Sequence, residues 1–279
     1  MSDLRYPGGV YVEESGTPGS PAIVFIHGAG QSGREWQEHM RRLSDYHCLA
    51  PDLPGFGRSN HLAWVPKEQV ADLIAELIEA RVPTKRASVV GFSAGGLHVH
   101  TLLDRHPDRV ERAVIDGAPP YDASRFAKAF MRTVAVAGAA FPTTRLFRGF
   151  FRDTHDPEDL RVASRGARVR EFAQCFGTFV TFGAPCPTLL VAGEEDRFVR
   201  PTNAALAELM PHGEAWYVPD LGHGWTRAAV DLHIRMVDAW VAGQQLPSGL
   251  LGEPAPLPTK VERLQRTGLD LQQSMEVQK

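Results

Sequence analysis

The feature that most constrains this sequence is a Gly-x-Ser-x-Gly motif centred on Ser93, which stands between an apolar β-branched run and a helix-like run. In a turn this tight the strand and the helix crowd each other, so we expect a Cβ at Gly91 or Gly95 to clash. The turn lifts the Ser93 hydroxyl off the sheet and directs the Ala94 N–H at the same point. The motif therefore predicts a reactive serine at the end of a buried strand.

Strand-like and helix-like segments alternate on both sides of this motif. Residues 22–26 are apolar throughout, as in a strand that is buried on both faces of a parallel sheet, and another strand-like run covers 187–193. Residues 70–78 have the apolar spacing of an amphipathic helix. The alternation predicts an α/β fold with a mostly parallel central sheet, helices on both faces, and ligands bound at the C-terminal ends of the strands.

The alternation stops between residues 121 and 183. Helical patterns replace it, and ten of the fourteen Phe residues fall there. We therefore predict a core of residues 1–120 and 184–246 with a helical cap at 121–183. Residues 247–279 are predicted as a Pro-rich linker and a C-terminal tail, and the tail has three open roles: docking on the core, joining a second subunit, or staying mobile.

Composition excludes several classes of function. The net charge of −3 does not favour a nucleic-acid partner. Three cysteines without a CxxC spacing and an N-terminus without an apolar leader predict reduced thiols and a cytoplasmic protein. The sequence has no run of 18 apolar residues, so it predicts no membrane span. No phosphate loop, dinucleotide glycine pattern or His/Cys cluster is present, so we expect neither a cofactor nor a metal.

A serine needs an adjacent base, and the base needs an orienting acid. His223 lies in a Gly-flanked loop after the last core strand, and Asp196 follows the preceding strand. Both strand ends should lie at the same sheet edge as Ser93. We predict Ser93 as nucleophile, His223 as general base and then acid, and Asp196 as partner of the imidazolium. Asp116, which ends the strand before the cap, remains the alternative acid.

The tetrahedral oxyanion needs two preorganised N–H donors. Ala94 is one, and the loop after Ile26 should supply the other, most simply from Ala29 with Gly30 as second choice. Gly30 and several aromatic residues are also candidates for substrate binding, although each aromatic side chain is equally suited to core packing. These aromatic candidates are Trp36, Phe92, Phe126, Phe130, Phe198 and Trp225.

Five motifs in order resemble the α/β-hydrolase superfamily. The resemblance covers about residues 10 to 243 and implies the fold of that superfamily, with a helical cap between the sixth and seventh core strands. The motifs are His27-Gly28-Ala29-Gly30, the turn at 52–59, the serine turn at 91–95, Gly193-x-x-Asp196 and Gly222-His223.

Together these features predict a serine hydrolase that cleaves a carboxylic ester through an acyl-enzyme. The small-molecule substrate is expected to place an apolar or aromatic group under the cap. Hydrolysis of a C–C bond, lactone opening, perhydrolysis and acyl transfer use the same triad and stay open. The alternative from another class is a non-hydrolytic ligand-binding receptor on this fold. Nine Arg and one Lys against six acidic residues give the cap an excess of +4, which fits a solvated face or an anionic substrate group.

Overall fold

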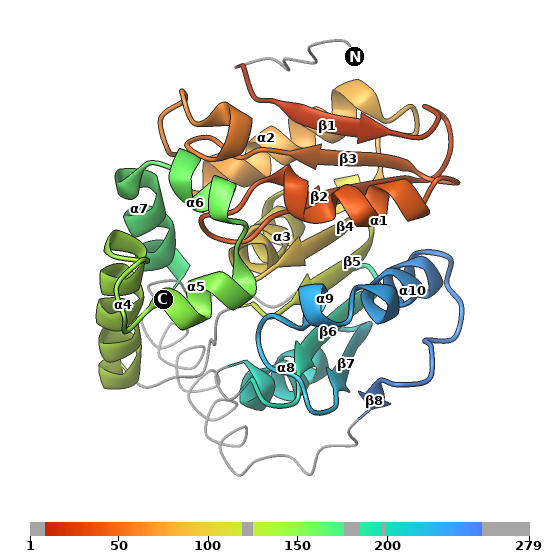
Figure 1. Cartoon of the computed structure of the whole chain (residues 1–279). Coiled ribbons are helices and arrows are strands. Elements are labelled where there is room, and N and C mark those ends of the chain that lie inside the picture. The colour runs from red at the N-terminus through yellow and green to blue at the C-terminus, as the bar shows by residue number, and fades with distance from the viewer. Residues whose placement is uncertain (1–8, 119–124, 176–184, 197–198, 253–279) are drawn as a thin grey trace, which may run out of the picture.

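The computed structural model describes residues 9–118, 125–175, 185–196 and 199–252 (Figure 1). An eight-stranded sheet runs through it in the order β1-β3-β2-β4-β5-β6-β7-β8. The six strands from β2 to β7 are parallel, and β1 and β8 pair antiparallel at the two edges. The predicted α/β fold class is confirmed. The strands are β1 (Val12–Ser15), β2 (Ala22–Ile26), β3 (His47–Pro51), β4 (Ala87–Phe92), β5 (Val110–Asp116), β6 (Thr188–Gly193), β7 (Gly213–Val218) and β8 (Leu251–Gly252).

Helices cover both faces of this sheet. Short 3-10 turns occupy Gly33–Trp36, Gly57–Ser59 and Pro107–Arg109. The α-helices are α1 (Gln37–Arg42), α2 (Lys67–Arg81), α3 (Ala94–Arg105), α4 (Arg125–Ala140), α5 (Arg148–Thr154), α6 (Pro157–Val162), α7 (Arg165–Cys175), α8 (Arg200–Glu208), α9 (Trp225–Ala228) and α10 (Val230–Val241).

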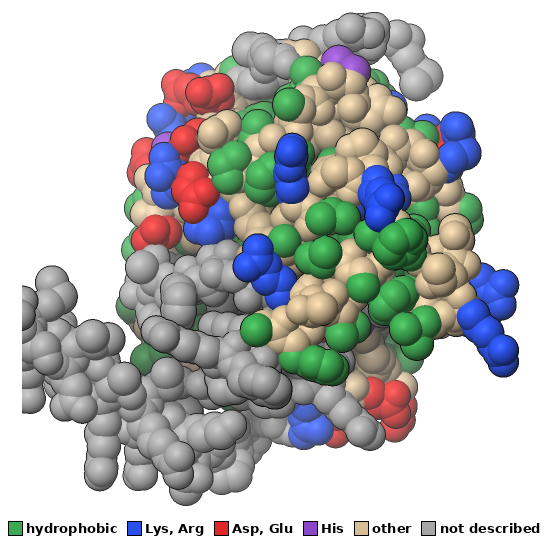
Figure 2. Space-filling view, turned by 90° about the vertical axis from the view of Figure 1, so that its left-hand side faces the viewer, with side chains coloured by type: hydrophobic (Ala, Val, Ile, Leu, Met, Phe, Trp, Pro, Cys, Tyr) green, Lys and Arg blue, Asp and Glu red, His purple; other side chains and the backbone are tan. Residues whose placement is uncertain are grey.

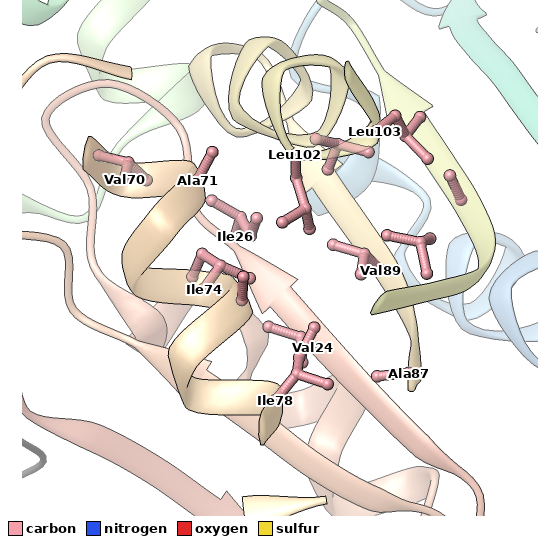
Figure 3. Close-up of a cluster of buried hydrophobic side chains, with 14 of the residues drawn as sticks. Val24, Ile26, Val70, Ala71, Ile74, Ile78, Ala87, Val89, Leu102 and Leu103 are labelled. Atoms are coloured by element: carbon pink, nitrogen blue, oxygen red, sulfur yellow. The ribbon is translucent and has the colours of Figure 1, made fainter. Parts of the chain in front are cut away.

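The apolar strands supply both halves of the core. Successive side chains of a strand point to opposite faces, so an apolar strand needs cover on both sides. Val24 and Ile26 pack with side chains of α2 and α3, as Figure 3 shows. Ile23 and Phe25 point the other way and pack with α1 and α10. Burying each such side chain contributes about 1.5–3 kcal/mol, which fixes the strands that position the site.

The inserted helices α4–α7 (residues 125–175) lie together beside the sheet (Figure 1). Helix α4 packs on α7, and α7 contacts α3. They follow β5, the fifth described strand, whereas the family resemblance placed a cap after the sixth. The described sheet therefore has five strands before these helices, and residues 1–8 lie outside the described residues.

Two segments differ from the prediction near the C-terminus. Leu251–Gly252, which was predicted as linker, pairs with Trp216 and Tyr217 of β7 and extends the sheet. The sequence predicts one helix from Trp225 to about Ala242, but the helix is divided at Ala229, whose φ of −128° and ψ of 49° are not helical. Within the described ranges, no helix combines the length and the apolar character that crossing a membrane requires.

Candidate active site

Ser93 occupies a strained turn between β4 and α3. Its φ of 54° and ψ of −114° lie in a region that costs a non-glycine residue about 1–3 kcal/mol and that persists mainly at functional sites. A Cβ on Gly91 would lie 2.3 Å from the Gly95 carbonyl oxygen, and a Cβ on Gly95 would lie 2.1 Å from the Ile26 carbonyl oxygen. The crowding expected from the motif is therefore present, and only glycine fits at both positions.

The parallel register brings the loops of the site to one sheet edge. Phe92 of β4 stands beside Asp116 of β5, and Gly193 of β6 stands beside Val218 of β7. The loop after β6 is tied to the loop after β7, because the Glu195 N–H donates to the Leu221 carbonyl over 2.9 Å. Segments distant in the sequence therefore meet above the C-terminal ends of the strands.

Ser93, His223 and Asp196 form one hydrogen-bonded chain. His223 Nε2 lies 3.1 Å from Ser93 Oγ, and His223 Nδ1 lies 2.7 Å from Asp196 Oδ2. Burial acts to lower the pKa of His223, but the hydrogen bond to Asp196 and its charge outweigh burial and raise the pKa above its ordinary value. This geometry lets the imidazole take a proton from the serine hydroxyl while the carboxylate holds the ring.

Asp116, the alternative acid, lies nearby but has other partners. Its Oδ1 accepts from Trp225 Nε1 over 2.8 Å, and His233 Nε2 lies 3.4 Å from its Oδ2. Burial raises the pKa of Asp116 to about 8 against the hydrogen bond from Trp225, so its carboxyl is largely protonated at neutral pH. A neutral carboxyl without a hydrogen bond to His223 is a poor partner for an imidazolium.

The two candidate oxyanion donors flank the serine. Ala94 is the first residue of α3, where backbone N–H groups have no partner within the helix. Ala29 follows β2, and the Gly28 carbonyl before it accepts from His27 Nδ1 and from the Gln31 N–H. Among the described residues, the N–H groups of Ala29 and Ala94 have no hydrogen-bond acceptor. Both are thus available to a developing oxyanion.

Side chains next to these donors are apolar. Ala29 and Ala94 pack in one cluster with Leu97 of α3 and with Cys175 and Phe172 of α7. The cluster combines residues of the core with residues of the inserted helices. It therefore offers an apolar wall beside the point where an acyl carbonyl would bind.

Three of the six predicted aromatic contacts have surroundings that do not mark them as substrate contacts. Trp36 has no exposed surface and stacks on Phe25 in the core, at 5.1 Å between ring centroids. Trp225 is 1% exposed, and its Nε1 donates a hydrogen bond to Asp116. Phe130 is 64% exposed to solvent. Helical spacing in a sequence identifies an apolar face of a helix. It does not show whether that face packs on the core or lines the site, so it could not place these side chains.

The remaining predicted contacts have different outcomes. Phe92 lies beside the site, with its ring centroid 5.2 Å from that of His223. Gly30 is buried with a φ of 79° and faces His155 of the inserted helices. The side chain of Phe126 and the whole of Phe198 lie outside the described residues.

Comparisons with known proteins identify the family of this chain. The model of the alpha/beta hydrolase family matches residues 23–233, which is most of the chain. The chain belongs to the alpha/beta hydrolase family. It is 26% identical over 259 residues to an AB hydrolase superfamily protein of Gibberella zeae, which covers 85% of each chain.

Two further similarities of this alpha/beta hydrolase are to esterases. It is 36% identical over 101 residues to the pimeloyl-[acyl-carrier protein] methyl ester esterase of Vibrio vulnificus, a match that spans 36% of this chain and 38% of that protein. A solved thermophilic esterase of Thermogutta terrifontis superposes with a TM-score of 0.65 and 21% identity, covering 87% of this chain and 97% of that chain. That likeness shows the shared fold.

The sequence of this alpha/beta hydrolase did not point to four polar residues around the oxyanion loop. Glu35 accepts from the Gly28 N–H over 3.3 Å and from Gln31 Nε2 over 2.8 Å. His155 Nε2 lies 2.7 Å from the Ala29 carbonyl oxygen, and Ser32 Oγ donates to Asp159 over 2.7 Å. His155 and Asp159 come from the inserted helices and belong to no short motif, so only the tertiary structure reveals them.

The outer face of the inserted helices carries a mixed surface. From that side, hydrophobic side chains stand among Lys and Arg side chains (Figure 2). Val134 is 43% exposed, Phe141 is 52% exposed and Leu146 is 81% exposed. Of the described arginines in this segment, Arg132, Arg145 and Arg148 are exposed, so much of its positive excess faces solvent.

Gly193 determines how the loop of His223 crosses the sheet edge. A Cβ on Gly193 would lie 2.2 Å from the Leu221 carbonyl oxygen, whereas a Cβ on Gly222 would have nothing within 4 Å. We expect Gly193→Ala to displace the histidine, lowering kcat about 100-fold and the free energy of unfolding by about 1–3 kcal/mol. Chemical denaturation should leave Gly222→Ala within about 0.5 kcal/mol of wild type. Equal losses in both variants would contradict this account.

Proposed function

We propose that this alpha/beta hydrolase is a serine hydrolase that cleaves a carboxylic ester of a small molecule through an acyl-enzyme. The observation that carries the proposal is the continuous chain from Ser93 through His223 to Asp196, with contacts of 3.1 and 2.7 Å. A strained serine at the start of a helix adds to it, because such strain persists mainly where function requires it.

The proposed reaction has two halves. Ser93 Oγ attacks the ester carbonyl while His223 Nε2 takes the proton of the serine hydroxyl. The resulting oxyanion accepts hydrogen bonds from the N–H groups of Ala29 and Ala94. Protonated His223 then gives its proton to the leaving alkoxide, which departs as the alcohol. Water, deprotonated by His223, then attacks the acyl-serine carbonyl. The bond to Ser93 Oγ breaks, His223 returns the proton to that oxygen, and the acid leaves. Asp196 stabilises the imidazolium in both halves.

The apolar cluster beside the donors supports a substrate with an apolar or aromatic acyl group. Leu97, Cys175 and Phe172 pack with Ala29 and Ala94 in one apolar cluster. Of these residues Phe172 is only partly buried, so an apolar acyl chain beside the reacting carbonyl would bury more of its surface, at about 25 cal/mol per Å². We expect p-nitrophenyl butyrate or benzoate to be preferred over the acetate.

A labelling experiment tests the proposal against the receptor alternative. A fluorophosphonate probe should add one phosphonyl group to the wild-type protein, located by peptide mass mapping at Ser93, and none to Ser93→Ala. The ester panel is assayed in parallel. An unlabelled wild type without turnover of any ester would favour a ligand-binding protein on this fold and contradict the proposal.

A further inference from the structure

The peptide group between Gly28 and Ala29, which carries the Ala29 N–H, is held by two hydrogen bonds to its carbonyl oxygen. His27 Nδ1 donates to the Gly28 carbonyl over 2.8 Å, and the Gln31 N–H donates to the same oxygen over 3.2 Å. In a planar trans peptide the C=O and the N–H point in opposite directions. Holding the Gly28 oxygen toward the core therefore turns the Ala29 N–H away from it.

The peptide after Ala29 is held by a residue of the inserted helices. His155 Nε2 lies 2.7 Å from the Ala29 carbonyl oxygen, and Thr154 Oγ1 lies 2.7 Å from His155 Nδ1. A carbonyl oxygen can only accept, so Nε2 carries the proton. Burial lowers the pKa of His155 to about 4, so the ring is neutral at pH 7 and Nδ1 accepts from the threonine hydroxyl. The partners on both ring nitrogens therefore define one tautomer.

Two neighbouring hydrogen bonds also join the loop after β2 to the inserted segment. Gln31 Nε2 donates to the Thr154 carbonyl over 2.8 Å, and Ser32 Oγ donates to Asp159 Oδ1 over 2.7 Å. All four of these residues are at most 4% exposed. Buried hydrogen bonds of this kind are costly to leave unmade, so the loop and the inserted segment hold each other in place.

We propose that His155 is a positioning residue for the oxyanion hole. From the inserted helices it fixes the orientation of the peptide that follows Ala29, and through it the direction of the Ala29 N–H. The oxyanion hole is thereby complete only while the inserted helices are docked on the core. This inference rests on the proposed function, because it concerns the same reaction.

Three variants test it in the full chain. His155→Leu keeps apolar bulk beside Phe151 but loses the donor, and His155→Gln returns an N–H near the Nε2 position. Gln174→Met is the matched control, because Gln174 Oε1 accepts from the Lys67 N–H over 2.8 Å and so also joins the inserted helices to the core, away from the oxyanion loop.

We expect His155→Leu to lower kcat for a p-nitrophenyl ester about 10- to 100-fold with KM changed less than about 3-fold, since an oxyanion contact forms in the transition state. The rate of phosphonylation by the fluorophosphonate should fall in parallel. His155→Gln should recover kcat to within about 5-fold of wild type, and Gln174→Met should retain it. Thermal melting of each variant is measured alongside.

Unchanged kcat in His155→Leu, or a rise in KM alone, would overturn the inference while wild-type turnover leaves the proposed function standing. A loss of kcat in Gln174→Met as large as in His155→Leu, with no recovery in His155→Gln, would also overturn it, since it would indicate general loosening of the inserted helices. A wild type that is neither labelled nor active would remove the proposed function and this inference together.

Discussion

Ser93→Ala is expected to lower kcat for a p-nitrophenyl ester by about 10⁶-fold, because removing a nucleophile disables the triad as a unit. Ser93 Oγ is the hydroxyl within 3.1 Å of His223 Nε2, so no group takes its place in the variant. The measurement is steady-state turnover together with rapid mixing, in which the wild type should release a burst of p-nitrophenol and the variant none.

The fold should survive this change. Alanine removes one hydroxyl from a residue that is held by its backbone, since the Ser93 N–H donates to the Asp116 carbonyl over 2.7 Å. Ser88→Ala is the matched control: Ser88 is buried on β4, five residues earlier in the chain, and its variant should keep kcat within about 2-fold. A Ser93→Ala protein that retains more than about 1% of wild-type turnover, free of wild-type contamination, would exclude Ser93 as the nucleophile.

The serine turn was predictable because its cause is local. The steric conflict at Gly91 and Gly95 is set by neighbours within the motif and by the adjoining strand β2. The places of Asp196 and His223 also followed from chain order, because each loop succeeds a strand of a parallel sheet. Their contact distances depend on ties such as that from Glu195 to Leu221, which no sequence pattern specifies.

Other features lay beyond the sequence for physical reasons. A tryptophan is equally suited to the core and to the mouth of the site, so the sequence cannot tell these locations apart. The packing of the structure places Trp36 and Trp225 in the core. His155 reaches Ala29 across 126 positions of the chain through a single hydrogen bond. β8 is an edge strand of two residues that pairs with β7, at a place where the sequence predicts linker. A segment this short has no detectable periodicity.

Asp196→Asn is expected to lower kcat by about 10³- to 10⁴-fold, whereas Asp116→Asn should cost less than about 5-fold. Asp196 Oδ2 is 2.7 Å from His223 Nδ1, and an amide in its place removes the charge that stabilises the imidazolium. Asp116 bonds Trp225 instead, and burial already raises its pKa to about 8, so an uncharged amide resembles its state at neutral pH.

The dependence on pH separates the two aspartates further. His223 must be neutral to act as base, and its pKa lies above 6.5 because Asp196 outweighs the effect of burial. In the wild type, kcat/KM should therefore fall as the pH drops through that raised pKa. In Asp196→Asn the inflection should move to lower pH, since burial then acts without the opposing carboxylate. In Asp116→Asn it should move far less.

Stability gives an independent reading for Asp116. Its folded pKa of about 8 lies above the ordinary value of 3.8, so between these values the folded state binds a proton that the unfolded state has lost. The free energy of unfolding should therefore fall as the pH rises from about 4 to 8, and this slope should weaken in Asp116→Asn. Denaturant titrations of wild type and variant across this range measure it. A large loss of kcat in Asp116→Asn with little loss in Asp196→Asn would instead assign the triad acid to the end of β5.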